Sequence, residues 1–210
     1  MLHALMKRRA WLQAALGLGL SLGLAPPAAA QSVELAGGVK FEPTMQLGGK
    51  ALTLNGAGIR YKAIFKVYAA GLYLGAHATT PEAVYAAPGP KRIRIVMYRE
   101  IDANELGKLF TQGMEKNVSP AEFTRAINGT IRLGELFAKR KKLVAGDYFD
   151  VDWVPGTGST VLVNGHPEIL PIKEPEFFNA LMSIWLGKSP ADSQLRLALL
   201  GQSANRAYGQ

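Results

Sequence analysis

The sequence predicts an α+β fold, in which a large, mainly antiparallel sheet is covered by helices. Segments with β-branched, aromatic and alternating residues run from 33 to 74 and return at 92–98 and 148–172. Segments with apolar residues every three or four positions occupy 102–139 and 175–201. Strands and helices thus come in separate runs, which favours α+β over the strict alternation of a parallel α/β fold.

The first thirty residues have the composition of a secretory signal. Residues 7–9 are basic, residues 14–24 are apolar, and Ala28, Ala29 and Ala30 form a small-residue cleavage site. This order is typical of a cleaved signal peptide, and the apolar run is too short for a membrane span. We therefore expect a signal peptide at 1–30, a domain at 31–201 and a polar tail at 202–210.

The export route has two interpretations. Arg8 and Arg9 resemble the pair of a twin-arginine signal, which exports folded proteins, but an ordinary signal with two arginines explains them equally simply. The chain has no cysteine, which excludes disulfides, thiolate catalysis and a lipoprotein anchor. Together these features predict a periplasmic protein without a transmembrane segment.

The charge balance favours an anionic partner. The formal net charge is +8, and three of these charges lie in the signal at Lys7, Arg8 and Arg9. A periplasmic protein meets no chromosome, so nucleic acid is a poor candidate partner. A small anionic molecule or an anionic membrane surface suits this moderate positive charge better.

The strands are bounded by turn residues. Gly48 and Gly49 separate two extended segments, and a further hairpin joins the strand that ends near Arg60 to the strand at 65–74. The later strand at 148–154 alternates Asp150 and Asp152 with apolar residues, and these like charges are expected to be solvated. The dipeptide at 164–165, Asn-Gly, is the strongest hairpin signal in the chain.

The helices begin at recognisable caps. Thr80 precedes Pro81, Asp102 precedes Glu105 at capping-box spacing, and Ser119 stands three residues before Glu122. Apolar stripes follow these caps, and two further helices are expected after Pro175 and Pro190. The basic run at 139–142 is expected to lie at a helix C-terminus in solvent, with contact to an anionic membrane as the alternative.

Arg60 poses the main functional question. It stands between glycine-rich residues 56–58 and a strand that carries Lys66 and Tyr68. A strand does not bury an arginine unless an anion meets it. Arg60 is therefore either a solvated charge at a strand end or the anion holder of a pocket. Lys66 shares the parity of Tyr68 in a regular strand, so it either joins Arg60 or points to solvent.

Three segments resemble the chalcone isomerase family. They are residues 55–60 (Asn-Gly-Ala-Gly-Ile-Arg), residues 65–74 (Phe-Lys-Val-Tyr-Ala-Ala-Gly-Leu-Tyr-Leu) and residues 184–190 (Ile-Trp-Leu-Gly-Lys-Ser-Pro). The chain looks most like the short exported bacterial branch. The resemblance implies an open-faced β-sandwich, with a large antiparallel sheet, a helical layer and a ligand cleft between them.

The resemblance implies two kinds of activity. Family enzymes close a ring by adding a phenolate to an enone, whereas fatty-acid-binding members hold a carboxylate between an arginine and a tyrosine. Arg60 matches the family arginine, and Tyr68 stands at the position of a threonine. Phe123 replaces the family tyrosine, and Thr130 stands near the family asparagine. Because the ketone-side hydroxyls are mostly lost, binding is favoured over catalysis.

The predicted ligand is a fatty acid or a similar amphiphilic or aromatic anion. The predicted ligand-binding residues are Arg60, Tyr68, Lys66, Tyr98, Phe123 and Thr130, and no catalytic residue is assigned. The alternatives are a chalcone isomerase-type lyase, and a scaffold or haem-binding protein. No metal or cofactor is expected, because His77 and His166 are far apart and no third ligand is spaced to join them.

Overall fold

The structure is a computed structural model that describes residues 32–202. The signal peptide predicted at 1–30 and the tail from 203 to 210 lie outside the described residues.

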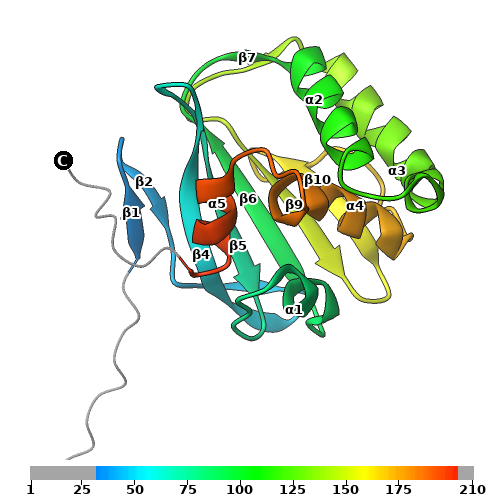
Figure 1. Cartoon of the computed structure of the whole chain (residues 1–210), viewed down its shortest axis with the longest axis horizontal. Helices are drawn as coiled ribbons and strands as arrows, with labels where there is room; N and C mark the ends of the chain where they lie inside the picture. The colour runs from blue at the N-terminus through cyan, green and yellow to red at the C-terminus, as the bar shows by residue number, and fades with distance from the viewer. Residues whose placement is uncertain (1–31, 203–210) are drawn as a thin grey trace, which may run out of the picture.

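A seven-stranded sheet forms the centre of the molecule, with strand order β11-β10-β9-β6-β5-β4-β3 (Figure 1). Neighbouring strands all run antiparallel, which confirms the predicted sheet. Two short ribbons accompany it, one of β1 with β2 and one of β7 with β8. The strands are β1 (Val33–Leu35), β2 (Val39–Phe41), β3 (Thr44–Leu47), β4 (Lys50–Lys62), β5 (Phe65–Leu74), β6 (Lys91–Met97), β7 (Ile101–Asp102), β8 (Lys142–Leu143), β9 (Tyr148–Val154), β10 (Gly158–Val163) and β11 (His166–Pro167).

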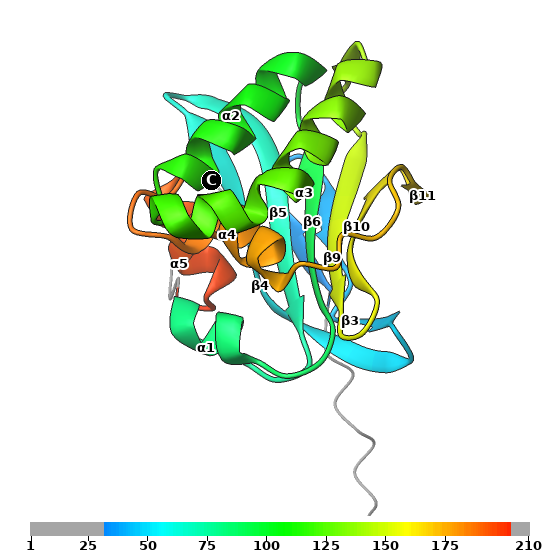
Figure 2. The same ribbon diagram turned by 90° about the vertical axis from the view of Figure 1, so that its right-hand side faces the viewer.

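The helices lie together on one face of the sheet, and the β1–β2 ribbon lies on the other (Figures 1 and 2). This arrangement confirms the α+β class and the helical layer. The helices are α1 (Pro81–Ala86), α2 (Ala103–Glu115), α3 (Pro120–Lys139), α4 (Pro175–Leu186) and α5 (Ser193–Leu199). Between residues 32 and 202, no helix is both long enough and apolar enough to cross a membrane.

Side-chain caps fix where most helices begin. Thr80 caps α1, Asp102 caps α2, and Ser119 forms a full capping box with Glu122 at the start of α3. Each cap satisfies backbone N–H groups that have no partner inside the helix. The last helix begins later than the sequence suggested, since Asp192 rather than Ser189 accepts the N–H groups of its first turn.

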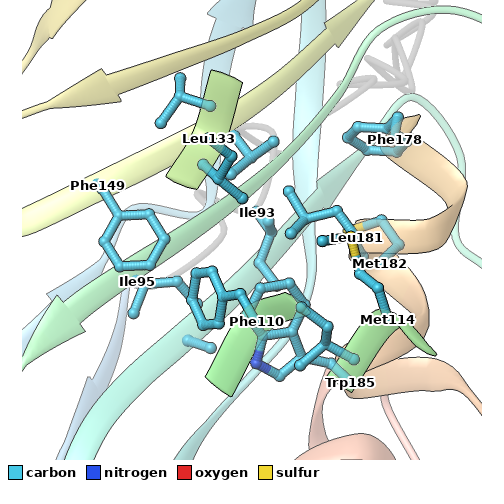
Figure 3. Packing of buried hydrophobic residues seen from close by; sticks show 14 of the residues in the cluster. Ile93, Ile95, Phe110, Met114, Leu133, Phe149, Phe178, Leu181, Met182 and Trp185 are labelled. Atoms are coloured by element: carbon cyan, nitrogen blue, oxygen red, sulfur yellow. The ribbon is translucent and has the colours of Figure 1, made fainter. Parts of the chain in front are cut away.

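Aromatic side chains fill the space between the sheet and the helices (Figure 3). Phe110 lies 5.6 Å from Trp185 and 5.8 Å from both Phe137 and Phe149, measured between ring centroids. Phe137 and Phe149 are 6.0 Å apart. Edge-on and tilted packing of this kind adds to the stabilisation from burial alone. We call these four residues the aromatic cluster.

The far face of the sheet carries a smaller core under the β1–β2 ribbon. Leu35 and Phe41 from the ribbon pack on Ile59, Ala69 and Tyr73 from β4 and β5. Tyr73 therefore packs in this core, and its hydroxyl donates a hydrogen bond to the carbonyl of Glu42 at 3.0 Å.

Two aspartates of β9 correct a prediction. Asp150 and Asp152 were expected to be solvated, but they are 1% and 4% exposed. They pair in register with Arg94 and Arg92 of β6. Arg94 donates two hydrogen bonds to Asp150 at 2.7 and 2.8 Å, and Arg92 binds Asp152 in the same forked way. The alternation of charges on β6 thus matches that on β9 and permits burial.

Helix α5 packs directly on β4 and places the chain before it beside Arg60. A Cβ atom at Gly56 would lie 2.0 Å from the carbonyl oxygen of Ala198, so only glycine allows this approach. The amide of Asn55 donates hydrogen bonds to Leu199 at 2.7 Å and to Ala78 at 2.9 Å. These contacts fix the C-terminal end of α5 over the middle of β4.

Candidate functional site

Arg60 and Tyr68 lie opposite each other on paired strands. They form a register pair between β4 and β5, and the Arg60 guanidinium carbon is 5.4 Å from the centroid of the Tyr68 ring. The Tyr68 hydroxyl accepts a hydrogen bond from the Trp185 indole N–H at 2.8 Å. Helix α4 therefore holds the phenol in place beside the guanidinium.

Both residues line a cavity of about 260 Å³ between the sheet and helix α2. The sheet contributes Arg60 and Tyr68, and the connection between α4 and α5 forms the opposite rim. We call it the Arg60 cavity. The other lining residues are Leu106, Leu109, Phe110, Gln112, Gly113, Lys116, Ile184, Ser189, Pro190 and Ala191. The cavity thus combines two cationic side chains with a wall that is about half apolar.

Arg60 has an unused hydrogen-bond donor at this cavity. Its Nε is buried and has no partner, and none of the ion pairs within residues 32–202 involves Arg60. A buried donor without an acceptor is costly, and for a guanidinium the natural acceptor is a carboxylate or phosphate. The guanidinium of Arg60 is therefore the group at this cavity that could bind an anion.

Tyr68 stays protonated at neutral pH. Burial raises the pKa of its hydroxyl to about 12, against the opposing effects of the Arg60 charge and the Trp185 hydrogen bond. The hydroxyl already accepts from Trp185, and the structure gives its hydrogen no acceptor among the described residues. Tyr68 can therefore donate a hydrogen bond to an anion bound by Arg60.

We expect stability to fall at alkaline pH, partly because of Tyr68. The unfolded chain loses the phenolic proton near pH 10 and the folded chain near pH 12. Between these values the unfolded state binds fewer protons, so the free energy of unfolding decreases as pH rises, on the order of 1–3 kcal/mol for this group. Urea unfolding at about pH 8 and about pH 11 measures the fall. The Tyr68→Phe variant should show a smaller fall, and an equal fall would contradict this assignment.

Lys66 and Tyr98 do not lie at the Arg60 cavity. The register between β4 and β5 shifts after Arg60, so that Val67 has no partner on β4. This bulge turns Val67 toward the helices together with Tyr68, and it reverses the side on which Lys66 lies. The Lys66 ammonium is 5.8 Å from the Tyr98 ring, which packs on the far-face core. The prediction that Lys66 joins Arg60 assumed a regular strand and is not met.

Phe123 and Thr130 are also placed away from the cavity. Both lie on α3, whereas α2 forms the helical wall of the Arg60 cavity. The Thr130 hydroxyl donates to the Ala126 carbonyl at 3.0 Å within its own helix, and Phe123 packs against the main core. Of the six predicted ligand residues, the structure brings only Arg60 and Tyr68 together.

None of the other residues of the site was predicted as a ligand residue, and three of them matter most for its chemistry. Phe110 and Lys116 come from α2, and Trp185 reaches Tyr68 from α4. Trp185 had a detectable signal, because an indole N–H in a strongly apolar helix needs a buried partner. No sequence signal pointed to Phe110 or Lys116, because the sequence does not show which end of the sheet their helix covers.

A second, larger cavity of about 440 Å³ lies among the helices. Its wall mixes charges of both signs, and Arg125 and Glu176 form an ion pair across 3.7 Å. Glu122 already binds the backbone at its helix start. Its three acidic and three basic lining residues balance, so this cavity offers an anion less net positive charge than the Arg60 cavity does.

The potential metal ligands within residues 32–202 are not clustered. In that range there is no group of three or more His, Asp or Glu side chains that could hold a metal ion. His77 and His166 are both exposed, on a loop and on β11, and neither lines a cavity described above.

Comparison with known proteins agrees with this geometry. A family model described as chalcone isomerase-like matches residues 33–201. Among solved structures, the crystal structure of a fatty-acid binding protein from Arabidopsis thaliana is similar, with a TM-score of 0.61 and 16% sequence identity. The match covers 81% of this chain and 96% of that chain. No curated protein matches the sequence. At this identity the structural likeness shows the fold alone.

Proposed function

The chain belongs to the chalcone isomerase-like family, and from this we propose that it binds an amphiphilic carboxylate, a fatty acid or a similar molecule, in the Arg60 cavity. One observation carries the proposal, namely the buried Arg60 Nε that has no acceptor beside a protonated phenol. A carboxylate supplies that acceptor, and it can take a forked pair of hydrogen bonds from the guanidinium.

The wall of the cavity suits the apolar part of such a ligand. Leu106, Leu109, Phe110 and Ile184 line it beyond the charged end. A ligand with a carboxylate at Arg60 would place its carbon chain against these side chains and remove them from water. Burial of each methylene contributes about 0.8 kcal/mol, so the chain rather than the head group would supply most of the affinity.

A binding role is favoured over catalysis. A cyclisation would need hydroxyl groups near the electrophilic end of the substrate as well as an anion holder. Phe123 has no hydroxyl, and the Thr130 hydroxyl is bound within its own helix away from the cavity. We therefore propose a carrier or sensor of the carboxylate. The sequence of residues 1–30 supports export, and we propose the periplasm as its site of action.

The aromatic cluster limits the length of the ligand. Typical pockets for drug-sized ligands measure about 300–1,000 Å³, and the Arg60 cavity, at about 260 Å³, is smaller. Phe110 lies on the cavity wall, and its ring packs against the other three rings of the aromatic cluster. Phe110 therefore closes the inner end, which favours a medium-length chain over a long one.

We expect octanoate to bind with 1:1 stoichiometry and at least as tightly as hexadecanoate, as measured by isothermal titration calorimetry. Phe110→Ala should reverse this order, because it opens the cavity toward the cluster. Phe178→Ala is the matched control, since Phe178 is equally buried but packs on Trp153 outside the cavity. Each variant should lose about 3–5 kcal/mol of stability, so circular dichroism first confirms folding. An unchanged order in Phe110→Ala would contradict the length limit.

A further inference from the structure

The tip of the β4–β5 hairpin exposes large apolar side chains. Ile64 is 83% exposed, Phe65 58% and Tyr61 38%. Within residues 32–202, the other large hydrophobic residues exposed to this degree lie one at a time on separate elements, namely Val33, Ile131, Val144 and Leu170. Isolated exposed hydrophobic residues are ordinary, whereas a group of three on one turn indicates a contact surface.

Basic side chains surround this tip. Lys62 and Arg99 are exposed, and the Arg99 guanidinium carbon is 5.7 Å from the Phe65 ring centroid. Lys66 packs on the Tyr98 ring below the tip. The chain carries no acidic residue between 60 and 81. The tip therefore consists of exposed apolar side chains surrounded by positively charged side chains.

The acidic groups near the tip are already engaged. Glu100 forms an ion pair with Lys142 at 2.8 Å. The carboxylate of Asp192 accepts hydrogen bonds from the Tyr61 backbone at 3.0 Å and from the first turn of α5. Glu100 is therefore balanced by Lys142, whereas Asp192 keeps its charge, which is smaller than the combined charge of Lys62, Lys66 and Arg99.

The backbone conformation of this turn is unfavourable for the residues that form it. Lys62 and Phe65 pair across a two-residue loop, and Ala63 has a φ of 54°, where glycine or asparagine is favoured. A turn optimised for stability would resemble Asn164–Gly165, which joins β10 to β11. The Ala-Ile sequence instead places a large apolar side chain at the end of a hairpin that projects at one corner of the molecule (Figure 2).

We propose that this hairpin tip docks the protein on an anionic lipid surface. Ile64 and Phe65 enter the interfacial region of the bilayer, and Lys62, Lys66 and Arg99 bind lipid phosphates. A lipid surface fits better than a protein groove, because the apolar residues project from the molecule and the exposed charged side chains around them are basic. Arg60 stands two residues before Lys62 on the same strand, so docking brings the Arg60 cavity to the surface from which an amphiphile is taken or to which it is delivered.

The test is co-sedimentation with phosphatidylglycerol–phosphatidylethanolamine vesicles. The protein is used as it is purified from the cells that express it. We expect the parent to bind these vesicles, to bind phosphatidylcholine vesicles at least tenfold more weakly, and to lose binding as salt rises. The Ile64→Ser, Phe65→Ser double variant should bind at least tenfold more weakly. The Ile131→Ser, Leu170→Ser double variant removes a similar exposed apolar area elsewhere and should bind within twofold of the parent.

A second variant reports insertion directly. Ile64→Trp should show a blue shift of its added fluorescence on anionic vesicles, with quenching by lipids that carry a bromine or spin label near the head group. Failure of the parent to bind, equal binding by the Ile64→Ser, Phe65→Ser variant, or an unshifted Ile64→Trp would each overturn the proposal. Octanoate binding in solution should be unchanged in the hairpin variants, so this result is separate from the test of the Arg60 cavity.

Discussion

Replacing Arg60 with alanine should weaken octanoate binding by about 2–5 kcal/mol, or roughly 30-fold to several thousandfold, while leaving the fold intact. The guanidinium is the group with an unused buried donor in the cavity, so its loss leaves the bound carboxylate without its main partner. Isothermal titration calorimetry measures the change in affinity, and circular dichroism confirms folding. Arg60→Lys should recover only part of the affinity, because an ammonium keeps the charge but not the fork.

The matched control is Arg125→Ala. Arg125 is a half-exposed arginine on the wall of the larger helical cavity, where it pairs with Glu176. Its removal should leave octanoate affinity within twofold of the parent. Loss of binding in Arg125→Ala with full binding in Arg60→Ala would move the ligand to the larger cavity and would refute the assignment of Arg60.

Replacing Asp150 with asparagine should lower the free energy of unfolding by about 3–5 kcal/mol. Asp150 is 1% exposed and accepts two hydrogen bonds from Arg94, and an Arg92 nitrogen lies 3.3 Å away. An asparagine side chain is neutral and has a single acceptor oxygen, so it cannot replace the carboxylate that accepts both hydrogen bonds from Arg94. The two largely buried guanidinium groups would then share the single carboxylate of Asp152. Urea denaturation monitored by tryptophan fluorescence measures this loss.

The surface pair of Glu34 and Lys40 provides the comparison. These side chains are 57% and 59% exposed and lie 3.3 Å apart, in the same antiparallel geometry as the β6–β9 pairs. Glu34→Gln should cost about 0–1 kcal/mol, because solvent screens an exposed pair. A loss in Asp150→Asn no greater than that in Glu34→Gln would show that the buried network contributes little to stability.

Much of the fold could be predicted because its signals are local. The turn at Asn164–Gly165, the caps at Thr80, Asp102 and Ser119, and the hairpin after Arg60 each depend on residues within a few positions of one another. The hairpin made β4 and β5 neighbours, but it did not by itself predict that Arg60 pairs with Tyr68. A regular register would place Val67 opposite Arg60, and the bulge shifts the partner to Tyr68.

Most of the errors come from contacts between distant segments, and one comes from a bulge inside the β4–β5 hairpin. The bulge at Val67 reverses Lys66, and a strand pattern alone contains no sign of it. The burial of Asp150 depends on β6 lying beside β9 in a register that opposes each aspartate with an arginine. Thr130 is excluded from the site only because α2, and not α3, lies over the cavity. For Asp150 and Thr130 the local pattern was read correctly, but the segment that packs against it was unknown.

The most direct measurement is the crystal structure of the protein with 8-bromooctanoate, with the bromine located by its anomalous scattering. Our account predicts the carboxylate within hydrogen-bond distance of the Arg60 guanidinium and the Tyr68 hydroxyl, with the bromine against Phe110 in the Arg60 cavity. Bromine density in the larger cavity beside Arg125, or a carboxylate that makes no contact with Arg60, would contradict it.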